Sequence, residues 1–134
     1  MEEKKDFYKV IEEICTQDNR YKPDAYEFVM QALNFTQKRL KKETHVSGGE
    51  LLAGMREFAI EEYGPMVLTV LGHWGVNSTE DFGNIVFNMI DKKVLAKTET
   101  DSIDDFKDVY DFQAAFGSVK IINILEIIDR ICFG

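Results

Sequence analysis

The chain has 134 residues, of which 45% are hydrophobic, and ten phenylalanines supply much of the apolar bulk. This composition predicts a single domain over residues 1–134 that buries one hydrophobic core. A formal net charge of -8 makes nucleic acid and anionic membrane surfaces unfavourable partners. Because no apolar run approaches the ~18 residues of a membrane span and no signal-peptide core opens the chain, the sequence predicts a cytoplasmic protein.

Two cysteines, Cys15 and Cys132, lie near opposite ends of the chain and outside any metal-ligand spacing. The favoured interpretation is that each is a small apolar residue in a reducing compartment. A disulfide that joins the two ends of the chain is the alternative.

The first 42 residues predict two helices. Apolar residues recur at helical spacing over residues 7–15, and a polar run then ends the pattern. Pro23 suits the first position of a second helix and Asp24 suits the positive end of its dipole, so we expect this helix over about 23–42. Its last turns are basic, which fits a solvated helix C-terminus better than a binding patch: Lys38, Arg39, Lys41 and Lys42.

The stretch from His45 to Ile90 carries the clearest helix signals. Ser47 and Glu50 have the spacing of a capping box, which predicts a third helix from this point. Gly64 and the proline after it stop that helix and start another.

The next predicted helix, over residues 66–71, is short and apolar on nearly every side, so we expect it at the centre of the core. A turn around Trp74 follows. Ser78 or Thr79 then caps a helix whose apolar residues repeat at three-and-four spacing up to the basic pair at 92–93.

The remaining third of the chain leaves two options open. Residues 94–98 can form a strand that pairs with 107–112 as a small β-hairpin, but residues 105–112 fit a helix equally well. Residues 118–133 form an amphipathic segment rich in isoleucine, for which we expect a helix and, through its apolar stripe, a homodimer contact. The predicted fold is therefore mainly α, a compact single-domain bundle of five to six helices. The sequence also allows a helix-turn-helix-like arrangement with a small β-hairpin near residues 94–112.

Five sequence words occur in one order between residues 21 and 116: Tyr21-x-Pro-x-Ala-Tyr-x-Phe-Val, His45-Val-Ser-Gly-x-Glu-Leu, Trp74-Gly, Thr79-x-Asp-Phe-Gly-x-Ile-Val-Phe-Asn and Asp105-Phe-x-x-Val-Tyr-Asp-Phe. In these words the chain resembles a small family of uncharacterised bacterial proteins. The resemblance implies no activity, cofactor or catalytic residue.

Four residues in the middle of the chain are not required by any helix signal: His45, Arg56, His73 and Trp74. With only two histidines, the chain cannot form a three-histidine metal site, and we predict no metal or cofactor. Packing of each ring at a helix end is the simpler interpretation. A pocket rimmed by His45, His73 and Trp74 is the functional alternative.

The segment from Glu99 to Asp111 is strongly acidic, but it lacks the spacing and the glycine of an EF-hand loop. We therefore expect a solvated or partner-facing surface that includes Asp105, Tyr110 and Asp111. One partner for this surface is the basic turn at 38–42 of the same molecule or of a second copy.

No nucleophile elbow or phosphate-binding loop occurs in the sequence. The leading functional prediction is a non-enzymatic interaction or adaptor domain that binds a protein partner. A nucleic-acid-binding winged helix is one alternative, with residues 65–72 and 79–93 as its helices and 94–112 as its wing. The charge of the second of these helices argues against DNA as a ligand, because the side chains expected on its outer face are acids and amides: Glu80, Asp81, Asn84, Asn88 and Asp91. A small-ligand or metal-dependent enzyme around the two histidines and the tryptophan is the other alternative.

Overall fold

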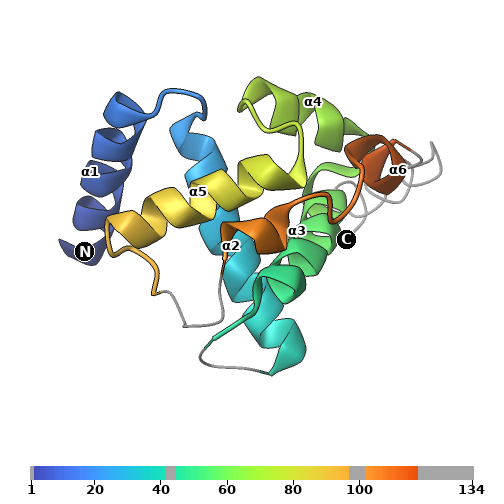
Figure 1. The fold of residues 1–134 in the computed structure, drawn as a ribbon, viewed down its shortest axis with the longest axis horizontal. Coiled ribbons are helices and arrows are strands. Elements are labelled where there is room, and N and C mark those ends of the chain that lie inside the picture. Colours follow the sequence, from blue (N-terminus) through green and yellow to red (C-terminus); the bar gives the residue numbers. More distant parts are fainter. Residues whose placement is uncertain (1, 42–44, 97–101, 118–134) are drawn as a thin grey trace, which may run out of the picture.

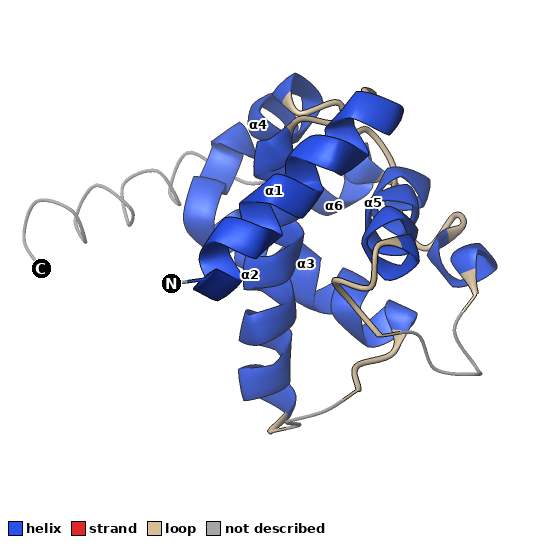
Figure 2. Ribbon diagram, turned by 90° about the vertical axis from the view of Figure 1, so that its left-hand side faces the viewer, coloured by secondary structure: helices blue, strands red, loops and turns tan. Residues whose placement is uncertain are grey.

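The computed structural model describes residues 2–41, 45–96 and 102–117. Within these ranges every regular element is a helix and no strand occurs, which confirms the prediction of a compact, mainly α fold (Figure 2). None of the described helices combines the length and the apolar character that a membrane crossing requires. The elements in chain order are α1 (Glu2–Gln17), α2 (Pro23–Leu40), α3 (Gly48–Tyr63), the 3-10 helix η1 (Gly64–Met66), α4 (Val67–His73), α5 (Thr79–Asp91), the 3-10 helix η2 (Ile103–Phe106) and α6 (Phe112–Phe116).

Helices α2 and α3 form the most extensive pair, and α5 crosses α2 while also contacting α1 (Figure 1). Helix η2 lies against α5 and α3, and the short helices α4 and α6 pack together beyond the other end of α3. The structure is therefore a bundle of crossing helices.

The helix starts and stops follow the sequence signals closely. The Ser47 hydroxyl accepts from the Glu50 N–H at 3.1 Å, and the Glu50 carboxylate accepts from the Ser47 N–H at 3.0 Å, which completes the expected capping box. Ser78 caps α5. Helix α2 ends at Leu40, two residues earlier than expected, because Lys41 adopts a left-handed conformation with φ of 56°.

The hairpin prediction for 94–112 is wrong over the residues that the structure describes. Residues 102–106 instead form a capped 3-10 turn, in which the Asp105 carboxylate accepts from the Ser102 N–H at 3.0 Å. Phe106 is buried beneath this turn, against α3 and α5, and residues 107–111 then run irregularly to α6. Residues 105–112 are thus neither a strand nor a continuous helix, and the predicted amphipathic segment at 118–133 lies outside the described residues.

Helix α4 does not lie at the centre of the core as expected. Val67 and Leu71 are fully buried, but Met66 just before the helix is 55% exposed, and Leu68 and Val70 are half-buried. Only one side of this helix faces the core.

Gly54 provides a direct test of the α2–α3 contact. A methyl group at Gly54 would collide with the hydroxyl of Thr36, a buried side chain that donates to the Ala32 carbonyl at 2.7 Å. We therefore expect Gly54→Ala to lower the free energy of unfolding by about 1–3 kcal/mol, measured by denaturant titration. Gly49→Ala is the matched control, since a methyl group there would meet no neighbouring atom within 4 Å. Equal effects of the two substitutions would contradict this packing.

Candidate functional site

Trp74, the only tryptophan, is held at the end of α4 by the turn between α1 and α2. The Lys22 N–H donates to the Trp74 carbonyl at 3.1 Å. Gly75 has a φ of 89°, and a Cβ there would collide with the Arg20 carbonyl, so only glycine fits this turn. The Trp74-Gly motif is therefore explained by the close approach of two chain segments.

The Trp74 ring packs within an aromatic cluster. Its centroid lies 5.7 Å from the Phe28 ring and 5.8 Å from the Tyr63 ring, and the planes of the Trp74 and Tyr63 rings meet at 83°. Phe28 is buried and Tyr63 is half-buried. The cluster therefore joins the core to the surface.

A cavity of about 210 Å³ opens beside this cluster, and we call it the Trp74 cavity. Carboxylates from the first two turns of α2 lie at its edge, and neither pairs with a lysine, arginine or histidine among the side chains that the structure describes, which begin at Phe7. The pKa of Tyr63 is raised first by burial and then by nearby carboxylates, Glu62 among them. The cavity is lined by Asp24, Glu27, Phe28, Gln31, Tyr63 and Trp74.

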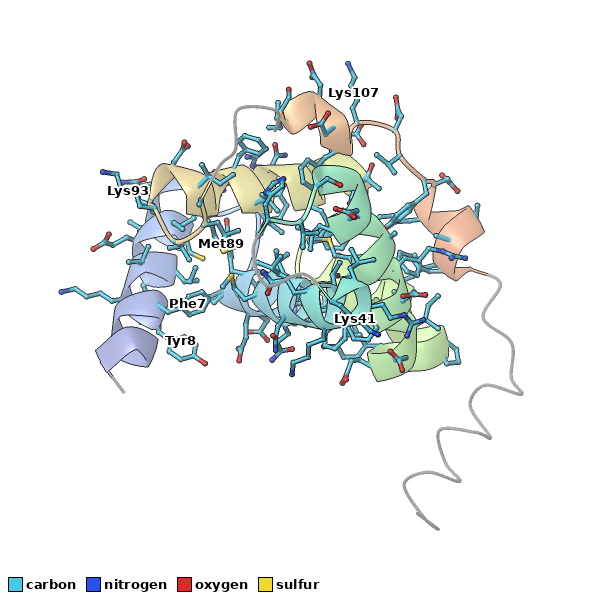
Figure 3. The ribbon with its side chains drawn as sticks, turned by 90° about the horizontal axis from the view of Figure 1, so that it is seen from below. Phe7, Tyr8, Lys41, Met89, Lys93 and Lys107 are labelled. Carbon is cyan, nitrogen blue, oxygen red and sulfur yellow. The ribbon has the colours of Figure 1, made fainter. Side chains whose placement is uncertain are left out.

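A further aromatic side chain reaches this acidic edge from α1. Tyr8 points from α1 toward α2 (Figure 3), and its hydroxyl donates to the Glu27 carboxylate at 3.3 Å. Tyr8 is 47% exposed, so this contact lies at the surface.

The indole N–H of Trp74 has no acceptor within the described part of the chain. The Trp74 side chain is only 8% exposed, yet every fully buried side-chain nitrogen or oxygen described has a hydrogen-bond partner. The indole nitrogen therefore keeps some contact with solvent, and Trp74 is one of the residues that line the Trp74 cavity.

The two histidines lie apart from the Trp74 cavity. His45 is exposed at the mouth of a separate apolar cavity of about 60 Å³, whose walls include Leu33, Leu51 and Phe106. His73 is exposed at the end of α4 and does not line the Trp74 cavity. The described residues include no group of histidine, cysteine or carboxylate side chains placed to hold a metal ion.

Two other candidate residues, Arg56 and Tyr110, meet at a groove of about 280 Å³ between α3 and residues 109–110. The Tyr110 hydroxyl donates to the Leu52 carbonyl at 2.8 Å, and burial raises the Tyr110 pKa although Arg56 opposes the shift. Tyr110 therefore anchors the irregular segment to α3.

The acidic candidates have local roles in capping. Asp105 completes the capping box of η2, and Asp111 caps α6 by accepting from the Ala114 N–H at 3.0 Å. A contact between these residues and the basic turn of the same molecule is not present among the described side chains, where Arg39 pairs with Glu57 at 3.1 Å. Contact with the basic turn of a second copy stays a prediction.

A polar network between the α1–α2 turn and α5 was missed by sequence reasoning. The Tyr21 hydroxyl donates to the Asp81 carboxylate at 2.6 Å and accepts from the Asn84 amide at 3.0 Å. One turn further along α5, the Asn88 amide donates to Asp18 at 2.9 Å. Asp81, Asn84 and Asn88, which were expected to point outward, therefore face the α1–α2 turn, whereas Asp91 is exposed as expected. The three-and-four spacing of residues 81, 84 and 88 was the only signal of this network.

Asp18 also accepts two bonds from the Arg20 guanidinium, at 2.9 and 2.7 Å. The hydrogen bonds from Arg20, supported by the bond from Asn88, hold the pKa of Asp18 well below its ordinary value, against the opposing effect of burial. The turn is thus fixed by charge-assisted bonds at the base of the segment that positions Trp74.

Comparison with protein-family models, curated proteins and solved structures finds no match to this chain. The resemblance to a bacterial family therefore stays a prediction.

The hydrogen bonds of the Tyr21 hydroxyl predict how the stability of the protein changes at alkaline pH. Burial and the Asp81 hydrogen bond raise the pKa of Tyr21 from 10.0 to about 12. The folded state thus favours the protonated phenol, so its stabilisation is complete below pH 10 and is lost as the pH rises toward 12. We expect Tyr21→Phe to destabilise the protein by about 1–3 kcal/mol at pH 7 and this difference from wild type to shrink between pH 10 and 12.

Denaturant unfolding at several pH values checks this expectation. Tyr8→Phe is the control, since its exposed hydroxyl makes only a surface bond. A Tyr21→Phe difference that stays constant up to pH 12 would show that the hydroxyl does not titrate as described.

Proposed function

We propose that this protein is a non-enzymatic interaction domain that binds a protein partner at the Trp74 cavity. The observation that carries the proposal is the combination of aromatic walls, carboxylates without a basic partner and an indole N–H without an acceptor, all among the described residues. Such groups gain interaction energy when a complementary surface covers them.

The composition of the cavity favours binding over catalysis. Its polar groups are two carboxylates, one amide, one phenol and the indole, with no serine, cysteine or histidine beside a base. At about 210 Å³ the cavity is also smaller than the ~300–1,000 Å³ typical of small-molecule sites, so it suits one side chain of a larger partner.

A nucleic-acid-binding role has less support. The described part of the expected wing contains no strand, and polar residues of α5 such as Asn84 and Asn88 are engaged within the protein. The overall charge of -8 also repels phosphate groups.

Two further parts of the proposal concern the protein's context. Self-association through residues 118–133 would add a second contact, and the mass of the protein in solution with and without residues 118–134 tests it. A cytoplasmic location is consistent with Cys15, which is a free thiol.

The proposal predicts that a partner is lost when the acidic edge is neutralised. We expect the tagged wild-type protein to retain a partner from cell extract, and the double variant Asp24→Asn, Glu27→Gln to retain about tenfold less of it. Quantitative mass spectrometry of the bound proteins provides the measurement.

The matched control is Glu12→Gln, Glu13→Gln, which removes the same charge from two exposed positions on α1. Thermal unfolding of all three proteins shows whether each is folded. Equal retention by both double variants, or no specific partner of the wild type, would rule out the Trp74 cavity as the contact.

A further inference from the structure

We infer that the Trp74 cavity receives a lysine or arginine side chain from a basic segment of the partner, together with a backbone carbonyl next to it. This inference rests on the proposed function and specifies the chemistry of the partner. Three independent features of the cavity lead to it: its charge, its ring geometry and its unused donor.

The charge selects a cation. Asp24 and Glu27 line the cavity, and Glu62 lies close enough to the Tyr63 hydroxyl to raise its pKa. None of the three carboxylates is paired with a basic side chain among residues 7–41, 45–96 and 102–117, whose side chains the structure describes. An ammonium or guanidinium group would supply the missing counter-charge, whereas an anionic side chain would be repelled.

The rings suit the same group. Tyr63 and Trp74 both line the cavity, and their rings meet edge to face, at 83° with their centroids 5.8 Å apart. The faces of tyrosine and tryptophan rings attract cations within about 6 Å, and the stem of lysine or arginine packs on their apolar surface. Phe28 closes the inner side of the cavity.

The unused donor adds a requirement that an isolated cation does not meet. The Trp74 side chain is 8% exposed, and its indole N–H has no acceptor in the described part of the protein. A peptide carbonyl beside the bound cation would accept from it. An apolar side chain in the cavity would remove water from the carboxylates and from the indole N–H without giving them new hydrogen bonds. Binding of an apolar side chain is therefore unfavourable.

Trp74 allows a direct test, because the chain contains only one tryptophan and its fluorescence reports on this cavity alone. The probes are acetylated and amidated Gly-Gly-X-Gly-Gly peptides with lysine, arginine, norleucine or glutamate at X. We expect a saturable fluorescence change with lysine and arginine, an affinity at least about tenfold weaker with norleucine, and none measurable with glutamate. Added salt should weaken binding of the cationic peptides.

Variants assign the binding to this cavity. Glu27→Gln should weaken binding of the better cationic peptide by about fivefold or more, while Glu12→Gln, the same change on α1, should leave it unaltered. Circular dichroism confirms that both variants are folded. Equal binding of the norleucine peptide, no saturable change with either cationic peptide, or an unaltered affinity in Glu27→Gln would overturn the inference.

The outcome separates this inference from the proposed function. If the double variant Asp24→Asn, Glu27→Gln loses a partner but the wild type binds neither cationic peptide, the cavity is still a contact and its cation specificity is wrong. If no partner depends on the cavity either, both proposals fall.

Discussion

The Phe28 ring is the interaction on which both the core and the candidate site depend. Its side chain is 2% exposed, and its centroid lies between 5.5 and 6.3 Å from four other rings, which come from α3, the end of α4, and α5: Phe58, Tyr63, Trp74 and Phe82. Because Phe28 belongs to α2, this single residue joins four segments of the chain. The inner wall of the Trp74 cavity is therefore also part of the hydrophobic core.

The acids beside this cluster are compatible with a stable fold because of where they lie. Asp24 lies in the first turn of α2, where the positive end of the helix dipole favours negative charge. Its carboxylate is thus stabilised without a basic side chain. Glu27 lies one turn further along and accepts a hydrogen bond from the Tyr8 hydroxyl.

The sequence predicted the elements whose signals are local and missed the features that depend on tertiary contacts. The capping box at Ser47 and the cap at Ser78 are formed by residues three positions apart, so spacing alone identifies them. The β-hairpin prediction is wrong because Phe106 is buried against Gly48 and Gly83. A Cβ at these two glycines would come within 3.2 and 2.7 Å, respectively, of the Phe106 side chain. A contact between residues so far apart in the sequence produces no periodic pattern by which it could be predicted.

The candidate site shows the same division. Trp74 was singled out because no helix signal requires it, and it lines a cavity. The acidic residues that line the cavity with Trp74 could not be found in this way. Asp24 and Glu27 belong to another helix, and their positions in the sequence are those of an ordinary helix start. His45 and His73 are chemically suited to line a pocket with Trp74, but the fold places neither of them in this cavity.

The most direct test of the central claim is nuclear magnetic resonance of the Trp74 indole N–H, which gives one signal in this chain. We expect this proton to exchange readily with water in the free protein. Addition of the lysine-centred peptide should then shift and protect it, together with backbone amides in the first turns of α2. An indole signal that is already protected in the free protein, or peptide-induced shifts centred on Arg56 and Tyr110 with the indole unchanged, would show that the Trp74 cavity is not the binding site.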